Sequence, residues 1–277
     1  MGLRIATNIA SQAVQKNLKE VSNEGQASLE KLSSGKRITK AADDAAGLAI
    51  ATNLDAQTKG LRQATRNAND GVSMIQTAEG GLNEVSNILV RLRELTIQAA
   101  SDTVGDTERG FLDKEYQQLT TEVDRIAEST TFNGTNLLNG DGKGTLDIQV
   151  GAYAGDQNKI EFDSDATNAS ADSIGVGGAS IADKDDALSA IDDIDGAISE
   201  VSGQRANLGS IQSRLQSTVA NLEVQTINQD NARSVIQDVD VAQETAKMAS
   251  SNVVKTAGIS ALAQANGIPN AALRLIG

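Results

Sequence analysis

From residue 61 to residue 99 the sequence carries small or apolar side chains at alternating intervals of three and four residues. This spacing places them on one stripe of an α-helix and is typical of a coiled-coil seam. It predicts one helix from about Asp44 to Ala100, roughly 85 Å long at ~1.5 Å per residue. Gly80 and Gly81 are positions where this helix is able to bend, since each glycine costs about 1 kcal/mol relative to alanine. The seam residues are Leu61, Ala64, Ala68, Gly71, Ile75, Ala78, Leu82, Val85, Leu89, Leu92, Thr96 and Ala99.

Four other stretches show helical periodicity. An N-terminal seam consists of Val14, Leu18, Val21, Gly25, Ser28 and Leu32, and we expect Gly35 to end that helix. A shorter helix is marked by Leu112, Tyr116, Leu119, Val123 and Ile126. A long helix from Ala187 carries Ile194, Val201, Leu208, Leu215 and Leu222 at intervals of seven, so that its seam pairs with the one ending at Ala99. After residues 228–234 we expect a last helix, ended by Gly267, Ile268 and Pro269.

The pattern changes between residues 132 and 186. Turn residues dominate 132–144, and Leu146, Ile148 and Val150 then alternate before Ile160 and Phe162, as in a small β hairpin. Residues 164–186 are small and acidic, and we expect them to form an exposed tip. The predicted fold class is therefore mainly α: a long antiparallel coiled-coil or helical-bundle rod with a small β hairpin region.

The residue types present exclude many kinds of chemistry. The chain contains no cysteine and no histidine, which rules out disulfides, thiolate or imidazole metal sites and histidine-based catalysis. Basic residues form no stripe and aromatics are few, which argues against nucleic-acid binding. No apolar run approaches the ~20 residues of a membrane helix. We therefore predict no enzymatic activity, cofactor, metal, nucleic acid or membrane insertion.

The stretch "LSSGKRITKAADDAAGLAIA", residues 32–51, raises the question of a phosphate or metal site. A P-loop fails here, because Glu30 stands where its first glycine belongs and Arg37 follows the lysine. Asp43 and Asp44 precede an alanine-rich run, the usual place of an N-cap. We interpret this stretch as a hinge between two helices.

Charge is unevenly distributed along the chain. The net charge is −13, residues 101–200 hold 22 acidic and 6 basic side chains, and no acidic side chain follows Glu244. Two terminal helices with seams of small residues bury too little surface to offset the entropy of ordering them. We predict that copies of the same chain cover their apolar positions. The candidate self-assembly residues are Leu3, Ile5, Ile9, Val14, Leu18, Val21, Val253, Ile259, Leu262, Leu273, Leu275 and Ile276.

Several longer stretches resemble bacterial flagellins along nearly the whole chain. They are "LRIATNIASQAVQKNL", "LSSGKRITKAADDAAGLAIA", "RNANDGVSMIQTAEGGLNEVSNILVRLRELTIQAA", "TTFNGTNLLNG", "DIQVGA", "ARSVIQDVDVAQETAKM" and "ALAQANGIPNAALRLIG". The resemblance implies that residues 1–42 and 233–277 form the inner coiled-coil tube of a filament. It also implies that residues 43–163 and 187–232 form a helical rod with a β hairpin at about 132–163. Residues 164–186 then replace the variable outer domains of longer flagellins.

The same resemblance implies an extracellular structural subunit that polymerises into the flagellar filament for swimming motility. Its implied partners are copies of itself, a flagellar export chaperone on the C-terminal helix, and the filament cap and hook-filament junction proteins. Export follows the flagellar type III route. The alternative is a hook-filament junction protein, which shares the terminal helices; "SGKRITKAADDAAGLAIA" and the "ALRLIG" end favour flagellin. An enzyme on a flagellin scaffold is a further alternative, but the tip is too short for a catalytic domain.

A last implication concerns a vertebrate Toll-like receptor that recognises flagellins. Its contact residues correspond here to Arg91 and Leu95 in "VRLREL" and to Glu115 in "LDKEY". Arg91 and Leu95 are four residues apart and outside the seam, so we expect a partner to reach both. Val90 replaces a polar glutamine of the receptor-active members.

Overall fold

The computed structural model describes residues 7–140 and 144–273, with the side chains of 268–273 left out. Within these residues it is mainly α-helical, with two small antiparallel sheets. The chain divides into two compact units: residues 57–227 form one, and the segments up to 56 and from 228 onward form the other. Two helices, α2 (Ala45–Ala99) and α4 (Lys184–Gln237), contribute to both units.

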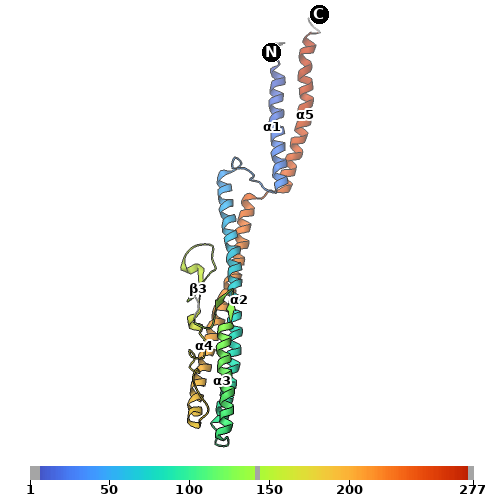
Figure 1. Cartoon of the computed structure of the whole chain (residues 1–277). Helices are drawn as coiled ribbons and strands as arrows, with labels where there is room; N and C mark the ends of the chain where they lie inside the picture. Colours follow the sequence, from blue (N-terminus) through green and yellow to red (C-terminus); the bar gives the residue numbers. More distant parts are fainter. Residues whose placement is uncertain (1–6, 141–143, 274–277) are drawn as a thin grey trace. The chain divides into compact units, whose positions relative to one another are not determined.

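In the unit of residues 57–227, α2 and α4 lie side by side with α3 (Asp106–Ser129) (Figure 1). All twelve positions of the 61–99 seam are buried, and so are the five positions spaced by sevens on α4. The heptad spacing thus correctly predicted both long helices and their pairing. The core is built from leucine, isoleucine, valine and alanine, with Tyr116 of α3 and Phe162 as its buried aromatics.

The turn between α2 and α3 is organised by Arg109. Its guanidinium donates hydrogen bonds to the backbone oxygens of Ala99, at 2.8 Å from Nε, and Ser101, at 3.1 Å from Nη2. A third bond, 2.9 Å long, runs from Nη1 to Asp106 Oδ1. These bonds supply donors to backbone oxygens at the end of α2 that no helical N–H reaches.

Two hairpins follow α3. β1 (Thr131–Phe132) and β2 (Thr135–Asn136) flank a two-residue turn of Asn133 and Gly134, both with positive φ. β3 (Thr145–Gln149) pairs with β4 (Lys159–Asp163), and Leu146 lies opposite Phe162 and Ile148 opposite Ile160. This second hairpin confirms the predicted alternation. Short 3-10 turns occur at Asp156–Asn158 and Asp165–Thr167.

Two glycines of α2 let these segments approach the helix closely. A Cβ atom at Gly71 would lie 2.8 Å from Ile148 Cδ1, and one at Gly81 would lie 2.7 Å from Leu138 Cδ1. Gly81 is therefore explained by close packing of the chain that follows α3, and α2 runs through it as one helix.

The prediction that residues 164–186 form an exposed tip is wrong for their apolar side chains. Ile174, Val176 and Ile181 are buried, together with Ala169 and Ala171, and belong to the main core cluster. The Ala171 N–H donates to Asp124 Oδ1 of α3 at 2.7 Å, and the Ile181 N–H donates to Asp113 Oδ1 at 2.9 Å. The reason is that irregular backbone brings isolated apolar residues to α3 without any period that a sequence pattern reveals.

In the other unit, α1 (Ile9–Ser34) pairs with α5 (Val241–Leu273). Backbone hydrogen bonds between residues 35–37 and 237–239 join the end of α1 to the chain that precedes α5. Gly35 ends α1 with φ 69°, as predicted, and Lys36 forms an antiparallel bridge with Asp238. The Arg37 N–H donates to the Gln237 oxygen at 2.7 Å, and the Val239 N–H to the Gly35 oxygen at 3.1 Å. This confirms a non-helical hinge between α1 and α2.

The two aspartates of the hinge bind backbone. Asp44 Oδ1 accepts the Gly47 N–H at 2.8 Å, which confirms Asp44 as the cap of α2. Asp43 Oδ2 instead closes the preceding turn, accepting the N–H groups of Thr39 and Lys40 at 3.0 Å. These bonds hold the pKa of Asp43 below its usual range.

Two helix boundaries differ from the expectation. α4 continues through residues 228–234 and ends only at Gln237, and α5 continues past Gly267, Ile268 and Pro269 to Leu273. Proline removes one helical hydrogen bond but has a φ compatible with a helix, so its presence weakens a helix without always ending it. No helix in the described part of the chain is long and apolar enough to cross a membrane.

Candidate assembly surface

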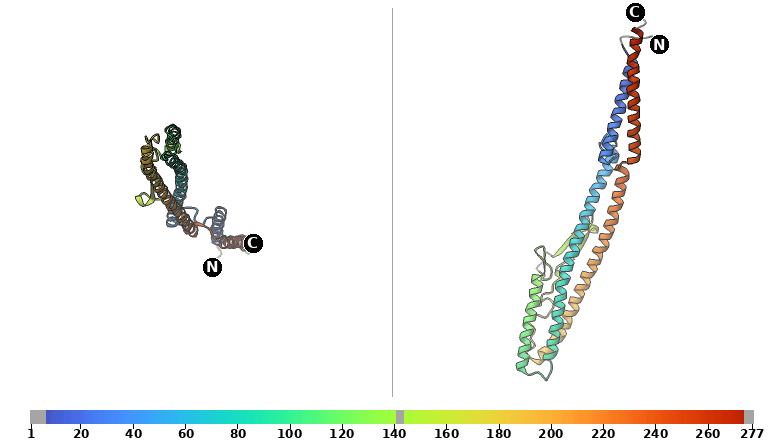
Figure 2. Two further views of the ribbon diagram at one scale, coloured as in Figure 1. Left: turned by 90° about the horizontal axis from the view of Figure 1, so that it is seen from below. Right: turned by 90° about the vertical axis from the view of Figure 1, so that its right-hand side faces the viewer.

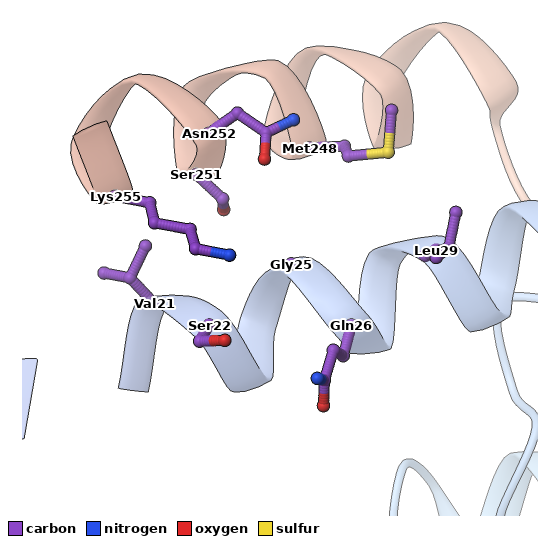
Figure 3. A pocket seen from close by; sticks show the side chains of 9 residues that line it. All are labelled: Val21, Ser22, Gly25, Gln26, Leu29, Met248, Ser251, Asn252 and Lys255. Carbon is purple, nitrogen blue, oxygen red and sulfur yellow. The ribbon is translucent and has the colours of Figure 1, made fainter. Parts of the chain in front are cut away.

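α1 and α5 lie side by side (Figures 1 and 2), and two glycines, Gly25 and Gly258, let the helices approach each other closely. A Cβ atom at Gly25 would lie 3.8 Å from Ser251 Cβ, and one at Gly258 would lie 3.3 Å from Leu18 Cδ1. Figure 3 shows Ser251 of α5 facing the turn of α1 that contains Gly25. Close approach through small residues leaves little apolar surface buried within the pair.

Polar bonds fix the register of the two helices. Ser28 Oγ donates to Glu244 Oε1 at 2.7 Å, and Ser11 Oγ donates to Asn266 Oδ1 at 2.8 Å. Glu244 is almost fully buried; its bond from Ser28, and secondarily Lys247 at 3.3 Å, keep the pKa of its carboxyl below the usual value. Because these groups lie at opposite ends of the pair, sliding one helix along the other would break both bonds.

The larger apolar side chains of the pair remain accessible to solvent. In the described parts of α1 and α5, no leucine, isoleucine or valine is buried. Ile9 is 61% exposed, Val253 70% and Ile259 54%. Several large apolar side chains exposed on one helix pair are typical of a protein interface.

The predicted self-assembly residues fall into three groups. The partly buried ones are Val14, Leu18, Val21 and Leu262, and the exposed ones are Ile9, Val253 and Ile259. The remainder lie where nothing is described of the side chain: Leu3, Ile5, Leu273, Leu275 and Ile276. Thus the described members are all accessible, and whether they contact another copy stays a prediction.

Grooves run along this surface between the helices. One hollow of about 290 Å³ is lined by Val14, Leu18, Val21, Val254, Gly258 and Ala261, among others. A second hollow, of about 250 Å³, shares Val21 with the first in its lining. Lys255 extends over this second hollow from α5 toward α1 (Figure 3). The first hollow is lined mainly by apolar side chains, whereas polar side chains such as Ser22, Asn252 and Lys255 line much of the second.

Three exposed apolar residues of α1 and α5 lie outside the predicted self-assembly set: Leu29, Val241 and Val254. Val254 lines the first hollow and Leu29 the second. Their signal was present in the sequence, because an apolar residue outside the seam of a helix has no partner within a two-helix pair.

The candidate receptor residues lie elsewhere, on α2 and α3. Arg91 is half exposed and donates to Glu115 Oε1, at 2.8 Å from Nη2, and to Glu94 Oε2 at 3.0 Å. These two carboxylates, Glu115 first, raise the pKa of Arg91. The structure therefore joins Arg91 and Glu115 in one exposed ion pair.

The expectation that a partner reaches Leu95 directly is wrong, because Leu95 is only 1% exposed. It belongs to the same buried cluster as Tyr116 and Val123 of α3 and Ile194 of α4. α2 packs against two helices, so its buried stripe is wider than the seam of a two-stranded coiled coil. Leu95 occupies this added width.

Comparisons with known proteins extend over almost the whole chain. Residues 5–143 match the family model of the bacterial flagellin N-terminal helical region, and residues 191–276 that of the C-terminal helical region. A flagellin of Halalkalibacterium halodurans is 43% identical over 97% of this chain and 98% of its own length. A flagellar filament 31.3 kDa core protein of Treponema maltophilum is 38% identical over 86% of this chain and 87% of its own.

A solved structure agrees with these matches. The crystal structure of Bacillus cereus flagellin is 32% identical, with a TM-score of 0.50, and the similarity covers 57% of this chain and 88% of that one. These similarities do not favour the hook-filament junction protein. Because the two family models together span more than half of the sequence, and a relative 43% identical spans nearly all of it, this chain belongs to the bacterial flagellin family.

Proposed function

We propose that this chain is the structural subunit of an extracellular flagellar filament, which it builds by polymerising with copies of itself for swimming motility. The observation that carries the proposal is the apolar surface of the α1–α5 pair, on which no described leucine, isoleucine or valine is buried. Proteins named flagellin and flagellar filament core protein among the relatives support it.

The energetics of the helix pair favour self-association. Ordering backbone costs about 1–2 kcal/mol per residue, and burial of large apolar side chains is the main term that offsets it. α1 and α5 contain 26 and 33 residues, yet the buried side chains of these two helices are Ser11, Ser28, Glu244 and Ala265 among those described. Copies of the chain packed on Val253, Ile259 and their neighbours supply the missing burial.

The division of labour along the chain is part of the same proposal. Residues 1–42 and 233–277 form the inner tube, residues 43–163 and 187–232 form the rod, and 164–186 replace larger outer domains. The apolar surface of α1 and α5 supports the first assignment, and the continuous buried seam of α2 and α4 supports the second.

Before assembly the apolar side chains of α1 and α5 are uncovered, and we expect proteins other than copies of the chain to bind there. We expect export through the flagellar type III system, an export chaperone that covers the C-terminal helix, and contacts with the filament cap and the hook-filament junction proteins. Exposed Val253, Val254 and Ile259 support a chaperone, since an uncovered apolar surface promotes aggregation. The absence of histidine and cysteine from the sequence supports a structural role rather than an enzymatic one.

For the vertebrate Toll-like receptor, the proposed contact is the exposed Arg91–Glu115 pair, with Leu95 supporting it from the core. Receptor-reporter assays with Arg91→Ala and Glu115→Ala test it. Loss of signalling by the monomer supports the contact, and undiminished signalling by both variants contradicts it.

Electron microscopy of the purified full-length chain tests the filament function, with Val253→Asp as the informative variant. A carboxylate at this 70% exposed site leaves the monomer folded but is costly to bury between copies. We expect long filaments from the wild type and none from Val253→Asp, with unchanged circular dichroism of the monomers.

Ala182→Asp is the matched control, because it adds the same charge at an exposed position far from α1 and α5 in sequence. It should form filaments like the wild type. Filaments of normal length from Val253→Asp would overturn the assignment of the surface, and short rings or caps from the wild type would favour a junction protein.

A further inference from the structure

The sequence contains three Asn-Gly dipeptides, at 133–134, 139–140 and 266–267. The structure places them in three different environments. Only one of these leaves both the asparagine side chain and the backbone nitrogen of the following glycine accessible. We propose that Asn133 is a site of spontaneous deamidation, which converts its amide to a carboxylate while Asn139 and Asn266 are protected.

The chemistry needs only water and a base. The backbone nitrogen of Gly134 loses its proton to the base and attacks Cγ of the Asn133 side chain. A C–N bond forms, the bond from Cγ to the side-chain nitrogen breaks, and ammonia leaves with a proton from solvent. Water then opens the resulting five-membered succinimide at either carbonyl. The net change is asparagine plus water to aspartate or isoaspartate plus ammonia.

Asn133 and Gly134 form the two central residues of the turn between β1 and β2, with φ values of 49° and 75°. Both residues are exposed, and nothing lies within 4 Å of the place where a Gly134 Cβ would stand. The ladder pairs Phe132 with Thr135, so that the Gly134 nitrogen lies outside it. Water, base and the Asn133 side chain therefore have free access to this nitrogen.

The turn also opens easily into the conformation that ring closure requires. The β1–β2 ladder has two residue pairs, Thr131 with Asn136 and Phe132 with Thr135. Two-stranded hairpins are marginal in water, and the opening of exposed local structure requires little free energy. Asn133 is the one non-glycine residue with positive φ in the described parts of the chain, so that opening also releases an unfavourable backbone angle.

The other two sites are restrained. Asn139 is engaged in an interaction, and Asn168 Nδ2 lies 2.5 Å from where a Gly140 Cβ would stand, which crowds the glycine. Asn266 lies within α5, and its Oδ1 accepts the Ser11 hydroxyl at 2.8 Å. A helical backbone and a held side chain keep the Gly267 nitrogen away from Cγ.

Deamidation would alter this hairpin in two ways. It adds a negative charge at the turn, and isoaspartate also inserts a methylene into the backbone between residues 133 and 134. The two-residue turn has matching positive φ angles that set the register of the strands, so the longer backbone would disrupt both residue pairs.

The experiment is incubation of the folded full-length chain in mildly alkaline buffer made with ¹⁸O-labelled water. Peptide mass spectrometry then measures label incorporation at each of the three dipeptides, which separates conversion during incubation from conversion during digestion. We expect Asn133 to convert about tenfold faster than Asn139 and Asn266. In denaturant all three should convert at similar rates, because each is followed by the same glycine.

Two outcomes would overturn the proposal. One is a folded-state rate at Asn133 no higher than at the other two sites, which would mean that the turn protects it. The other is a rate difference that persists unchanged in denaturant, which would mean that neighbouring sequence decides it. Asn133→Gln serves as the position control: most of the acidic species seen by isoelectric focusing of the incubated wild type should be lost in this variant.

Discussion

Arg109 has the only buried basic side chain in the parts of the chain that the structure describes. It is 7% exposed and binds the backbone oxygens of Ala99 and Ser101 where α2 ends. Arg109→Ala leaves the Ala99 oxygen without its donor, whereas the Ser101 oxygen still accepts the Val104 N–H at 3.2 Å. We therefore expect the free energy of unfolding to fall by about 1–3 kcal/mol. Urea denaturation followed by circular dichroism measures the change.

Arg125→Ala is the matched control for Arg109. Arg125 is on the same helix and forms an exposed ion pair with Glu122 at 2.6 Å. Exposed pairs of this kind contribute little, so we expect a change below about 1 kcal/mol. Equal effects of the two substitutions would contradict the role assigned to Arg109.

Glu244 predicts a dependence of the α1–α5 pair on pH. Its pKa in the folded chain is lowered from 4.5, with the bond from Ser28 as the largest cause and Lys247 and Lys31 as the cations nearby. The carboxylate therefore stabilises the folded pair above the unfolded pKa, and this stability is lost as the pH falls through the lowered value. Thermal melts at about pH 5 and about pH 3 should show a smaller loss in Glu244→Gln than in the wild type.

Glu24→Gln is the control for this pH effect, since Glu24 is an exposed carboxylate of α1. It should leave the pH dependence of the wild type unchanged. If the wild type and Glu244→Gln lose stability in parallel, the buried carboxylate does not stabilise the pair.

At the scale of elements, a substitution of Leu95 tests whether the buried stripe of α2 extends beyond the seam. Leu95→Ala removes a side chain that is 1% exposed, whereas Ile97→Ala, two residues later, removes one that is 48% exposed. We expect the unfolding free energy to fall by about 2–5 kcal/mol for Leu95→Ala. For Ile97→Ala we expect a change within about 0.5 kcal/mol. Denaturant titrations of both variants decide it, and similar values would mean that α3 does not cover this face of α2.

The segment from 164 to 186 gives a second test at this scale. Deletion of residues 168–180 removes Ile174 and Val176 from the core, together with the N–H of Ala171 that binds Asp124. Since burial of each such side chain contributes about 1.5–3 kcal/mol, we expect stability to fall by about 3 kcal/mol or more. The measurement is the urea midpoint, with Ile174→Ala and its exposed neighbour Ser173→Ala as a matched pair. A deletion that leaves the midpoint unchanged would restore the interpretation of this segment as an exposed tip.

At the scale of the whole molecule, charge sets the conditions for self-association. The chain carries a net charge of −13, and copies brought together repel one another. Salt screens this repulsion, with a Debye length of about 10 Å at 0.1 M, so the polymerisation rate should rise with ionic strength. Light scattering measures it, and the double variant Asp192→Asn, Glu200→Gln, which removes two exposed negative charges, should depend less on salt. A rate independent of salt in both proteins would contradict this.

The sequence by itself determined the helices, their pairing and the family. A strict alternation of three and four leaves one helical stripe apolar, and all twelve predicted seam positions of α2 are buried. Strand alternation likewise predicted the hairpin that contains Ile148 and Ile160, and the structure then placed these two residues opposite each other. Periodic signals are reliable because every repeat adds to the same geometric preference. The apolar, acid-free character of the C-terminus could also be recognised from the sequence, because it is a property of many residues together.

Only the tertiary structure decided the features that depend on a third element or on irregular backbone. Leu95 is buried because α3 covers α2 beside the seam, and no spacing within α2 records that helix. Ile174 and Val176 reach the core through turns, where side-chain direction follows no period. Asn133 and Asn266 are each followed by glycine, yet one lies in an open turn and the other is bonded to Ser11. Contacts between residues distant in sequence decide such differences, because they depend on which surfaces the folded chain brings together.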